Sequence, residues 1–220
     1  MTTGIVKVVV IGAGGHARAV IDAIQASGKA TAFAVVCDDG NMWGENIFGV
    51  PIVGNDEMLC QLENEGATHF VNAVGSLNNW RVRESIYKTG LASGLKPWTV
   101  IHPSAVISDH AIIGSGCQIM PGAHIIAGAV VGSNVLLNTR SVVEHDCCVD
   151  DHAFLATGAV LSGGVKVGEG ALIGSGASVR QGITIGCGAT VGVGSAVVKD
   201  VAPGETVVGN PAIPIRKHQA

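Results

Sequence analysis

The stretch from Leu155 to Val179 reads LATGAV-LSGGVK-VGEGAL-IGSGAS-V, so that a branched aliphatic residue opens every block of six. The same spacing holds at all seventeen such positions from Ile101 to Val197. An α-helix repeats every 3.6 residues and an amphipathic strand every two, so neither produces a period of six. We therefore predict a β-solenoid in which each hexad forms a short strand and a bend, with the aliphatic side chain filling the axis.

The other hexad positions support this prediction. The fourth residue after the aliphatic one is always Ala, Ser, Cys, Val or Ile, which fits beside it in a narrow core. Where a glycine directly follows the aliphatic residue, we expect it to supply backbone freedom at a corner. Four of these glycines share an 18-residue register in which Asp150 takes the missing place, so three hexads make one turn and the repeat gives roughly six coils at the ~4.8 Å strand separation. Glycine takes this position at residues 114, 132, 168, 174, 186 and 192.

The first part of the chain follows a different pattern. An apolar run, Val8–Ile11, meets a glycine-rich turn, and residues 17–26 then have the apolar spacing of a helix. Further strands are predicted at 32–37 and 70–74, and further helices at about 56–65 and 79–90. Strands that alternate with helices indicate a small parallel α/β sheet, similar to a Rossmann fold, covered on both faces.

The composition changes near Pro97. Seven of the eight aromatic residues lie before residue 99, and only Phe154 follows Ile101. We therefore predict two domains, an α/β domain at residues 1–97 and the hexapeptide-repeat domain at residues 98–220.

Composition also excludes several classes of protein. With 47% apolar and 14% charged residues the chain is not intrinsically disordered. A net charge of −4 gives no basic field for nucleic acid. The segment Met1–Lys7 lacks the basic start of a secretion signal, and Val8–Ile11 is too short to cross a bilayer. We expect a cytoplasmic protein with no nucleic-acid partner and no membrane insertion.

Three charged or titratable residues interrupt the repeat between Val143 and Val149. Glu144, His145 and Asp146 must point outward or lie at a corner, because the axis has no room for charge. A histidine beside a carboxylate is a plausible general base, since imidazole titrates near neutral pH and the acid can orient it. A solvated polar strip explains the same residues equally well. The pattern alone leaves both interpretations open.

The glycine turn before the first helix is a second candidate site. Residues 12–17, GAGGHA, fit the G-x-G-x-x-A pattern between a strand and a helix that dinucleotide-binding proteins use. Backbone N–H groups at such a helix start favour phosphate, whether it belongs to a dinucleotide or to a nucleotide-sugar. Asp38 and Asp39, at the end of the second predicted strand, can accept hydrogen bonds from a ribose or a base. A tight turn that binds nothing is the alternative.

Residues 138–147, NTRSVVEHDC, resemble the signature of the hexapeptide-repeat sugar acetyltransferases, which include bacillosamine and perosamine N-acetyltransferases and sialic acid O-acetyltransferases. The resemblance covers nearly the whole chain, and residues 208–212 fit the family's closing motif. It implies a left-handed parallel β-helix. It also implies that His145 is the catalytic base and that Asp146, where the family usually has Glu, raises its basicity.

The resemblance further implies the ligands and their contacts. Acetyl-CoA is expected as co-substrate along the outside of the coils, between subunits of a homotrimer, with no metal. The acceptor is expected to be a UDP- or GDP-linked 4-amino-deoxy sugar held by the first domain. The segment 76–80 is longer than the family's usual loop. The implied acetyl-CoA contacts are Phe154, Ser175 and Val193, the oxyanion candidate is the N–H of Gly163, and the nucleotide-sugar contacts are Gly14, Gly15, His16, Asp38, Asp39 and Gly75.

Phe154 and two further apolar residues bear on the same expectation. Phe154 occupies an outward position, where a ligand or subunit contact explains an aromatic residue better than core packing does. Ile126 and Val130 are also expected to face outward. Apolar surface of this kind predicts association into a trimer.

Other activities remain as alternatives. O-acetylation of sialic acid or another sugar hydroxyl needs the same base. Zinc hydration chemistry needs three converging imidazoles, but the residue five after His145 is Asp150, and His152 is seven away. A nicotinamide oxidoreductase rests on the glycine turn alone and leaves the hexads without a purpose. A non-catalytic binding protein requires the Glu144–Asp146 cluster to be accidental. The sequence therefore favours acetyl transfer from acetyl-CoA to the amine of a nucleotide-linked amino sugar.

Overall fold

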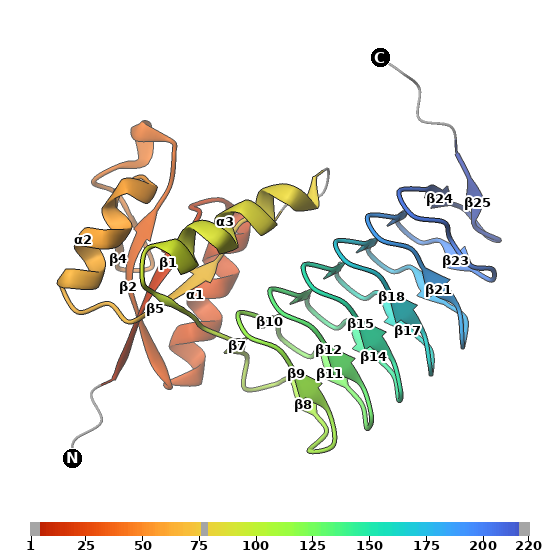
Figure 1. The fold of residues 1–220 in the computed structure, drawn as a ribbon. Coiled ribbons are helices and arrows are strands. Elements are labelled where there is room, and N and C mark those ends of the chain that lie inside the picture. Colours follow the sequence, from red (N-terminus) through yellow and green to blue (C-terminus); the bar gives the residue numbers. More distant parts are fainter. Residues whose placement is uncertain (1–4, 76–78, 216–220) are drawn as a thin grey trace. The chain divides into compact units, whose positions relative to one another are not determined.

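The computed structural model describes residues 5–75 and 79–215. The chain forms two compact units, Met1–Pro103 and Ser104–Ala220 (Figure 1). The division lies close to the change of composition at Pro97. Within the described ranges, no helix is long and apolar enough to span a membrane.

The first unit is built on a six-stranded sheet. All neighbouring strands are parallel except the edge pair β3 and β4, which form an antiparallel hairpin. The hairpin turn places Phe48 and Gly49 at φ angles of 50° and 83°. Because a phenylalanine rarely adopts such a φ, the sequence carries no usual hairpin signal here, and a purely parallel sheet was the wrong expectation. The order is β3-β4-β2-β1-β5-β6, with β1 (Val6–Ile11), β2 (Ala30–Val36), β3 (Asn46–Ile47), β4 (Val50–Gly54), β5 (His69–Asn72) and β6 (Lys96–Pro97), and β7 (Val100–Ile101) follows.

Helices cover both faces of this sheet. Val9 and Ile11 pack with Leu59 and Tyr87 from the second and third helices. Side chains alternate along a strand, so Val8 and Val10, which are fully buried, face the opposite side. The predicted helix at 56–65 is divided into a 3₁₀ turn and a short helix. The helices are α1 (Gly15–Ser27), α2 (Leu59–Asn64) and α3 (Trp80–Ala92), with 3₁₀ turns η1 (Gly40–Met42) and η2 (Asp56–Met58).

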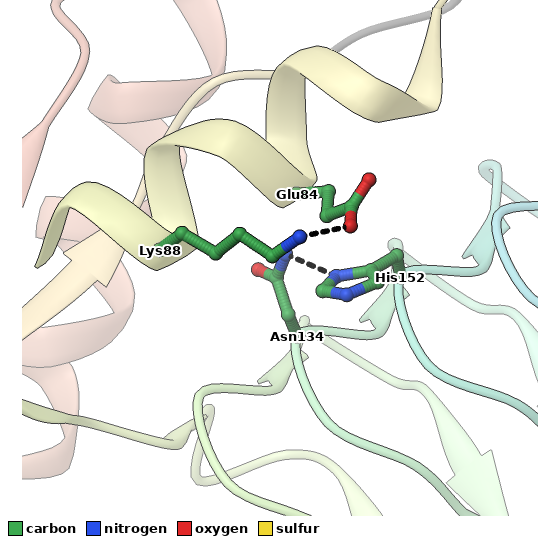
Figure 2. A network of polar contacts seen from close by, with 4 residues as sticks. All are labelled: Glu84, Lys88, Asn134 and His152. Atoms are coloured by element: carbon green, nitrogen blue, oxygen red, sulfur yellow. Dashed lines mark hydrogen bonds and ion pairs between the residues drawn. The ribbon is translucent and has the colours of Figure 1, made fainter. Parts of the chain in front are cut away.

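Surface charge also supports α3. Glu84 and Lys88 are one helical turn apart and form an ion pair along its surface (Figure 2). Such pairs stabilise a helix by about 0.2–0.5 kcal/mol. The side chain of Asn79 accepts a hydrogen bond from the N–H of Arg81, so the helix begins where the sequence predicts.

The second unit is a left-handed parallel β-helix. Each hexad contributes a two-residue strand whose second residue is the repeated aliphatic one, and from Ile119 to Val197 these residues are at most 2% exposed. Paired residues are 18 apart, as in Leu136 with Phe154, so three hexads make one coil as predicted. The coils stack as parallel rungs (Figure 1).

The strands fall into three sheets, one for each side of the prism. One has the order β25-β24-β22-β19-β16-β13-β10, the second β23-β20-β17-β14-β11-β8, and the third β21-β18-β15-β12-β9. The strands are β8 (Val106–Ile107), β9 (Ile112–Ile113), β10 (Gln118–Ile119), β11 (His124–Ile125), β12 (Val130–Val131), β13 (Leu136–Leu137), β14 (Val142–Val143), β15 (Cys148–Val149), β16 (Phe154–Leu155), β17 (Val160–Leu161), β18 (Lys166–Val167), β19 (Leu172–Ile173), β20 (Ser178–Val179), β21 (Thr184–Ile185), β22 (Thr190–Val191), β23 (Ala196–Val197), β24 (Thr206–Val208) and β25 (Ile213–Pro214).

The glycines that follow the aliphatic residues have a different role from the one expected. Gly114, Gly168 and Gly174 do not have left-handed φ angles. A Cβ at Gly168 would lie 2.6 Å from the backbone nitrogen of Cys187, and one at Gly174 would lie 2.7 Å from the carbonyl carbon of Gly192. These glycines therefore let the backbone of the next coil approach. The left-handed φ occurs two residues later, for instance at Gly116 and Gly176.

We predict that Gly168→Ala destabilises the β-helix by about 1–3 kcal/mol, because the obstacle is backbone and cannot move aside. The thermal midpoint, measured by circular dichroism, should fall by roughly 2–4 °C for each kcal/mol. Gly40→Ala is the matched control, since a Cβ there meets no atom within 4 Å. Equal midpoints for the two variants would contradict the packing role of Gly168.

Candidate active site

His145 and Asp146 lie in the turn between β14 and β15. Their side chains are 55% and 74% exposed, as expected for charged groups that the axis cannot hold. The Nδ1 atom of His145 lies 2.9 Å from Oδ2 of Asp146. A neutral imidazole in this contact donates its proton from Nδ1 to the carboxylate, which leaves Nε2 as an acceptor. The pair has the arrangement that a general base requires.

Two glycines leave room for this pair. Gly163 occupies the position of His145 one coil later, and a Cβ on it would collide with Nε2 and lie 2.5 Å from Cε1 of the imidazole. Gly128 occupies the position of Asp146 one coil earlier, and a Cβ on it would lie 2.5 Å from Oδ1 of that carboxylate. The sequence analysis missed Gly128, although the 18-residue register places it directly beside Asp146.

The peptide between Ser162 and Gly163 has a fixed direction. The thiol of Cys147, which is fully buried, lies 3.2 Å from the carbonyl oxygen of Ser162 and donates to it. Burial raises the pKa of the Cys147 thiol, so the thiol keeps its proton. In a trans peptide the N–H points opposite to the C=O, so the N–H of Gly163 points away from the core.

Ser175 and Val193 lie on another edge of the prism. They occupy equivalent positions in successive coils, in the turns that follow β19 and β22, and Val193 is 78% exposed. His145 lies on the edge between the β14 and β15 sheets, one full face away. A single β-helix therefore does not bring Ser175 and Val193 to His145.

Phe154 differs from the sequence expectation. Its side chain is only 7% exposed and lies in a column with Leu136 and Leu172 on the neighbouring strands. The expectation that this aromatic ring has little core to join was therefore wrong. The 18-residue register aligned it with two leucines, which a reading along the chain does not reveal. Its assignment to acetyl-CoA stays a prediction.

The glycine turn of the first unit lies at the carboxyl end of β1. Gly12 has a φ of 110°, and a Cβ on it would lie 2.6 Å from Cγ2 of Val74, so only glycine fits. Gly14 and Gly15 differ, because a Cβ on either would meet no atom within 4 Å. Gly14 precedes α1 without a side-chain cap, so the first N–H groups of the helix face open space. This is the geometry that binds phosphate.

A hollow of about 200 Å³ adjoins this turn. Asp38 lines it, as the sequence analysis expected for a ligand contact. Asp56 also lines it and was missed, because only the pairing of β4 with β2 brings residue 56 beside residue 38. Burial, and then the charge of Asp38, raise the pKa of the Asp56 carboxyl. The hollow is lined by Ile11, Gly12, Ala13, Val36, Cys37, Asp38, Asp56, Val74 and Ile86.

The remaining candidates of the first unit lie around the same strand ends. Asp39 directs Oδ1 to the N–H of Asn41, at 3.0 Å, and so caps η1. Gly75 lies against His16, since a Cβ on it would be 3.6 Å from the Cβ of His16. Arg83, fully buried, donates from Nη1 to the carbonyl of Val74 and so holds the segment before Gly75. Residues 76–78 of the longer loop lie outside the described ranges.

His152, the second histidine considered for zinc, has a structural contact. Nδ2 of Asn134 donates to its Nδ1 at 2.8 Å, and both side chains are buried (Figure 2). Asn134 and His152 also have left-handed φ angles, of 54° and 62°. The contact joins successive coils, because the two residues are 18 apart.

Comparisons with known proteins agree with this geometry. Residues 7–89 match the model of the PglD N-terminal domain, and residues 110–145 match the model of the bacterial transferase hexapeptide (six repeats). A comparison with curated protein sequences found no match.

Several solved structures are similar over the full chain. A histidine-to-asparagine mutant of perosamine N-acetyltransferase from Caulobacter crescentus, in complex with CoA and GDP-perosamine, is 36% identical; the match covers 96% of this chain and 97% of that one, with a TM-score of 0.90. The acetyltransferase domain of PglB from Neisseria gonorrhoeae, in complex with acetyl coenzyme A, is 39% identical, with coverage of 96% and 100% and a TM-score of 0.88. WeeI from Acinetobacter baumannii is 28% identical, with coverage of 96% and 100% and a TM-score of 0.81. On this similarity, and on the two domains that it spans, the chain belongs to the family of hexapeptide-repeat sugar N-acetyltransferases.

Proposed function

We propose that this protein transfers the acetyl group of acetyl-CoA to the amine of a nucleotide-linked amino sugar, with His145 as the general base. The observation that carries the proposal is the contact between Nδ1 of His145 and Asp146, which leaves Nε2 directed at Gly163 on the exposed edge of the coils. The bound ligands of the relatives from Caulobacter crescentus and Neisseria gonorrhoeae support acetyl-CoA and a nucleotide-sugar as the two substrates.

The reaction needs a base and an oxyanion site close together. The neutral amine attacks the thioester carbonyl, Nε2 of His145 takes the proton from the nitrogen, and Asp146 stabilises the imidazolium. The outward N–H of Gly163 can hold the oxyanion of the tetrahedral intermediate. The intermediate collapses to the amide and the thiolate of CoA, which takes the proton back from the imidazolium.

The first unit is proposed to hold the nucleotide-sugar. Its phosphates fit at Gly14 and Gly15, where the start of α1 is open, and the first turn of that helix also carries His16. The ribose or base fits in the hollow lined by Asp38, with Asp39 and Gly75 at the neighbouring strand ends. Carboxylate oxygens accept hydrogen bonds from ribose hydroxyls and from base N–H groups.

The second unit is proposed to complete its site in a homotrimer. Val106, Ile112 and Val130 are 51%, 65% and 41% exposed, and their strands flank the edge that carries His145. Ile126, on the same edge, is half-buried. Burying this apolar strip against another copy brings a different edge of the neighbour, with Ser175 and Val193, to His145. Acetyl-CoA then lies between two subunits.

His145→Ala is expected to lower kcat by about 10²–10⁴-fold, because the amine loses its base. Asp146→Asn should lower kcat less, since the imidazole remains. Thiol release from acetyl-CoA with UDP- and GDP-linked amino sugars measures both. His110→Ala is the matched control, an exposed histidine on the same edge. Near-normal turnover of a folded His145→Ala variant would overturn the assignment, and faster acetylation of hydroxyl sugars would favour an O-acetyltransferase.

Gly14→Val should weaken nucleotide-sugar binding by about tenfold or more and leave acetyl-CoA binding unchanged. The backbone at Gly14, with φ −74° and ψ −172°, accepts valine, so the fold survives while the side chain blocks the phosphates. Titration calorimetry with each ligand measures the two affinities. Equal weakening of both would show that the two units do not divide the substrates as proposed.

Light scattering at micromolar concentration should give three times the 22.2 kDa mass of the chain. The physical reason is the apolar strip beside His145, which a monomer leaves in water. A monomer that is fully active would contradict a site shared between subunits.

A further inference from the structure

Gly163 is unusual for its place in the coil. The corresponding residues of the other coils on this edge, 18 residues apart, are Asp109, Ala127, His145 and Gln181. Each carries a side chain, so the corner itself accepts a Cβ. The φ of Gly163 also lies outside the left-handed region, so its backbone does not require glycine.

The obstacle to a side chain at Gly163 is the imidazole. The three atoms nearest to a Cβ built there all belong to the His145 ring: Nε2, Cε1 at 2.5 Å and Cδ2 at 3.1 Å. At Gly168 and Gly174, by contrast, the nearest atoms are the backbone of the next coil. The glycines of the repeat therefore make room for the backbone, whereas Gly163 makes room for one catalytic ring.

We propose that Gly163 is a positioning residue whose missing side chain forms the seat that holds the imidazole of His145 at the reacting edge. This rests on the proposed role of His145 and is separate from the role of the Gly163 N–H, which any residue except proline retains. The ring is fixed on one side by the contact of Nδ1 with Asp146 and on the other by the flat surface of Gly163. Because the ring is about half exposed, an added methyl group displaces it into solvent and leaves the coil intact.

The test is a double-mutant cycle of Gly163→Ala and His145→Ala, measured by thiol release at saturating acetyl-CoA and amino-sugar nucleotide. Gly163→Ala alone should lower kcat by about 10–100-fold, the usual cost of displacing a catalytic group by an ångström. The thermal midpoint and the KM for acetyl-CoA should stay unchanged. In the His145→Ala background the same change should alter the residual rate by less than about twofold, because no ring remains to be displaced.

Gln181→Ala is the matched control. It places an alanine at the same corner one coil further on, and kcat should stay within about twofold of the unmodified protein. The control shows whether alanine at this corner of a coil is harmless in itself.

Each other outcome overturns the seat. A normal kcat for Gly163→Ala shows that the ring needs none. An equal loss in the His145→Ala background shows that residue 163 acts through its peptide, and a midpoint lowered as far as in Gly168→Ala shows that the coil needs the glycine. Normal turnover of His145→Ala alone is a failure of the proposed function and is recognised independently of residue 163.

Discussion

The stacking of hexapeptide coils in an 18-residue register is the constraint on which the second unit depends. Backbone hydrogen bonds join each residue to the coil above, as between the N–H of Gly164 and the carbonyl of His145 at 2.9 Å. Successive coils are therefore about 4.8 Å apart, and any two residues 18 apart are neighbours. This spacing is close to the thickness of an aromatic ring with its contacts. An imidazole can lie flat against the next coil only where that coil has no side chain, which is the case at Gly163.

The same register distributes the chemistry over the edges of the prism. One edge carries His145 and Asp146 with the exposed apolar strip, and another carries Ser175 and Val193. A rigid β-helix cannot bend to bring these edges together, because every strand is bound to its neighbours on both sides. A site that uses both edges must be completed by another copy of the chain. Rigidity thus fixes the catalytic geometry and, in our proposal, also makes association a condition of activity.

The first unit uses strand order where the second uses register. The carboxyl ends of β1, β2, β4 and β5 meet at one edge of the sheet, where parallel α/β sheets commonly bind ligands. Gly12 allows the chain to turn close to Val74, and Gly14 and Gly15 leave the start of α1 open. Asp38 and Asp56 lie 18 positions apart in the chain for no periodic reason. They share one hollow because β2 and β4 are adjacent strands.

Sequence alone determined the period of six, the coil of 18 residues, the strand–turn–helix of the first unit and the outward position of His145, because each depends on local spacing or on the exclusion of charge from an apolar axis. Only the tertiary structure decided the features that depend on which segments become neighbours. These are the burial of Phe154 in its column of leucines, the antiparallel β3–β4 hairpin, the presence of Asp56 beside Asp38, and the use of glycine after each aliphatic residue for close approach rather than for a left-handed φ. The physical reason is the same in each case: a contact between chain segments depends on both partners, and a pattern read along one of them describes only half of it.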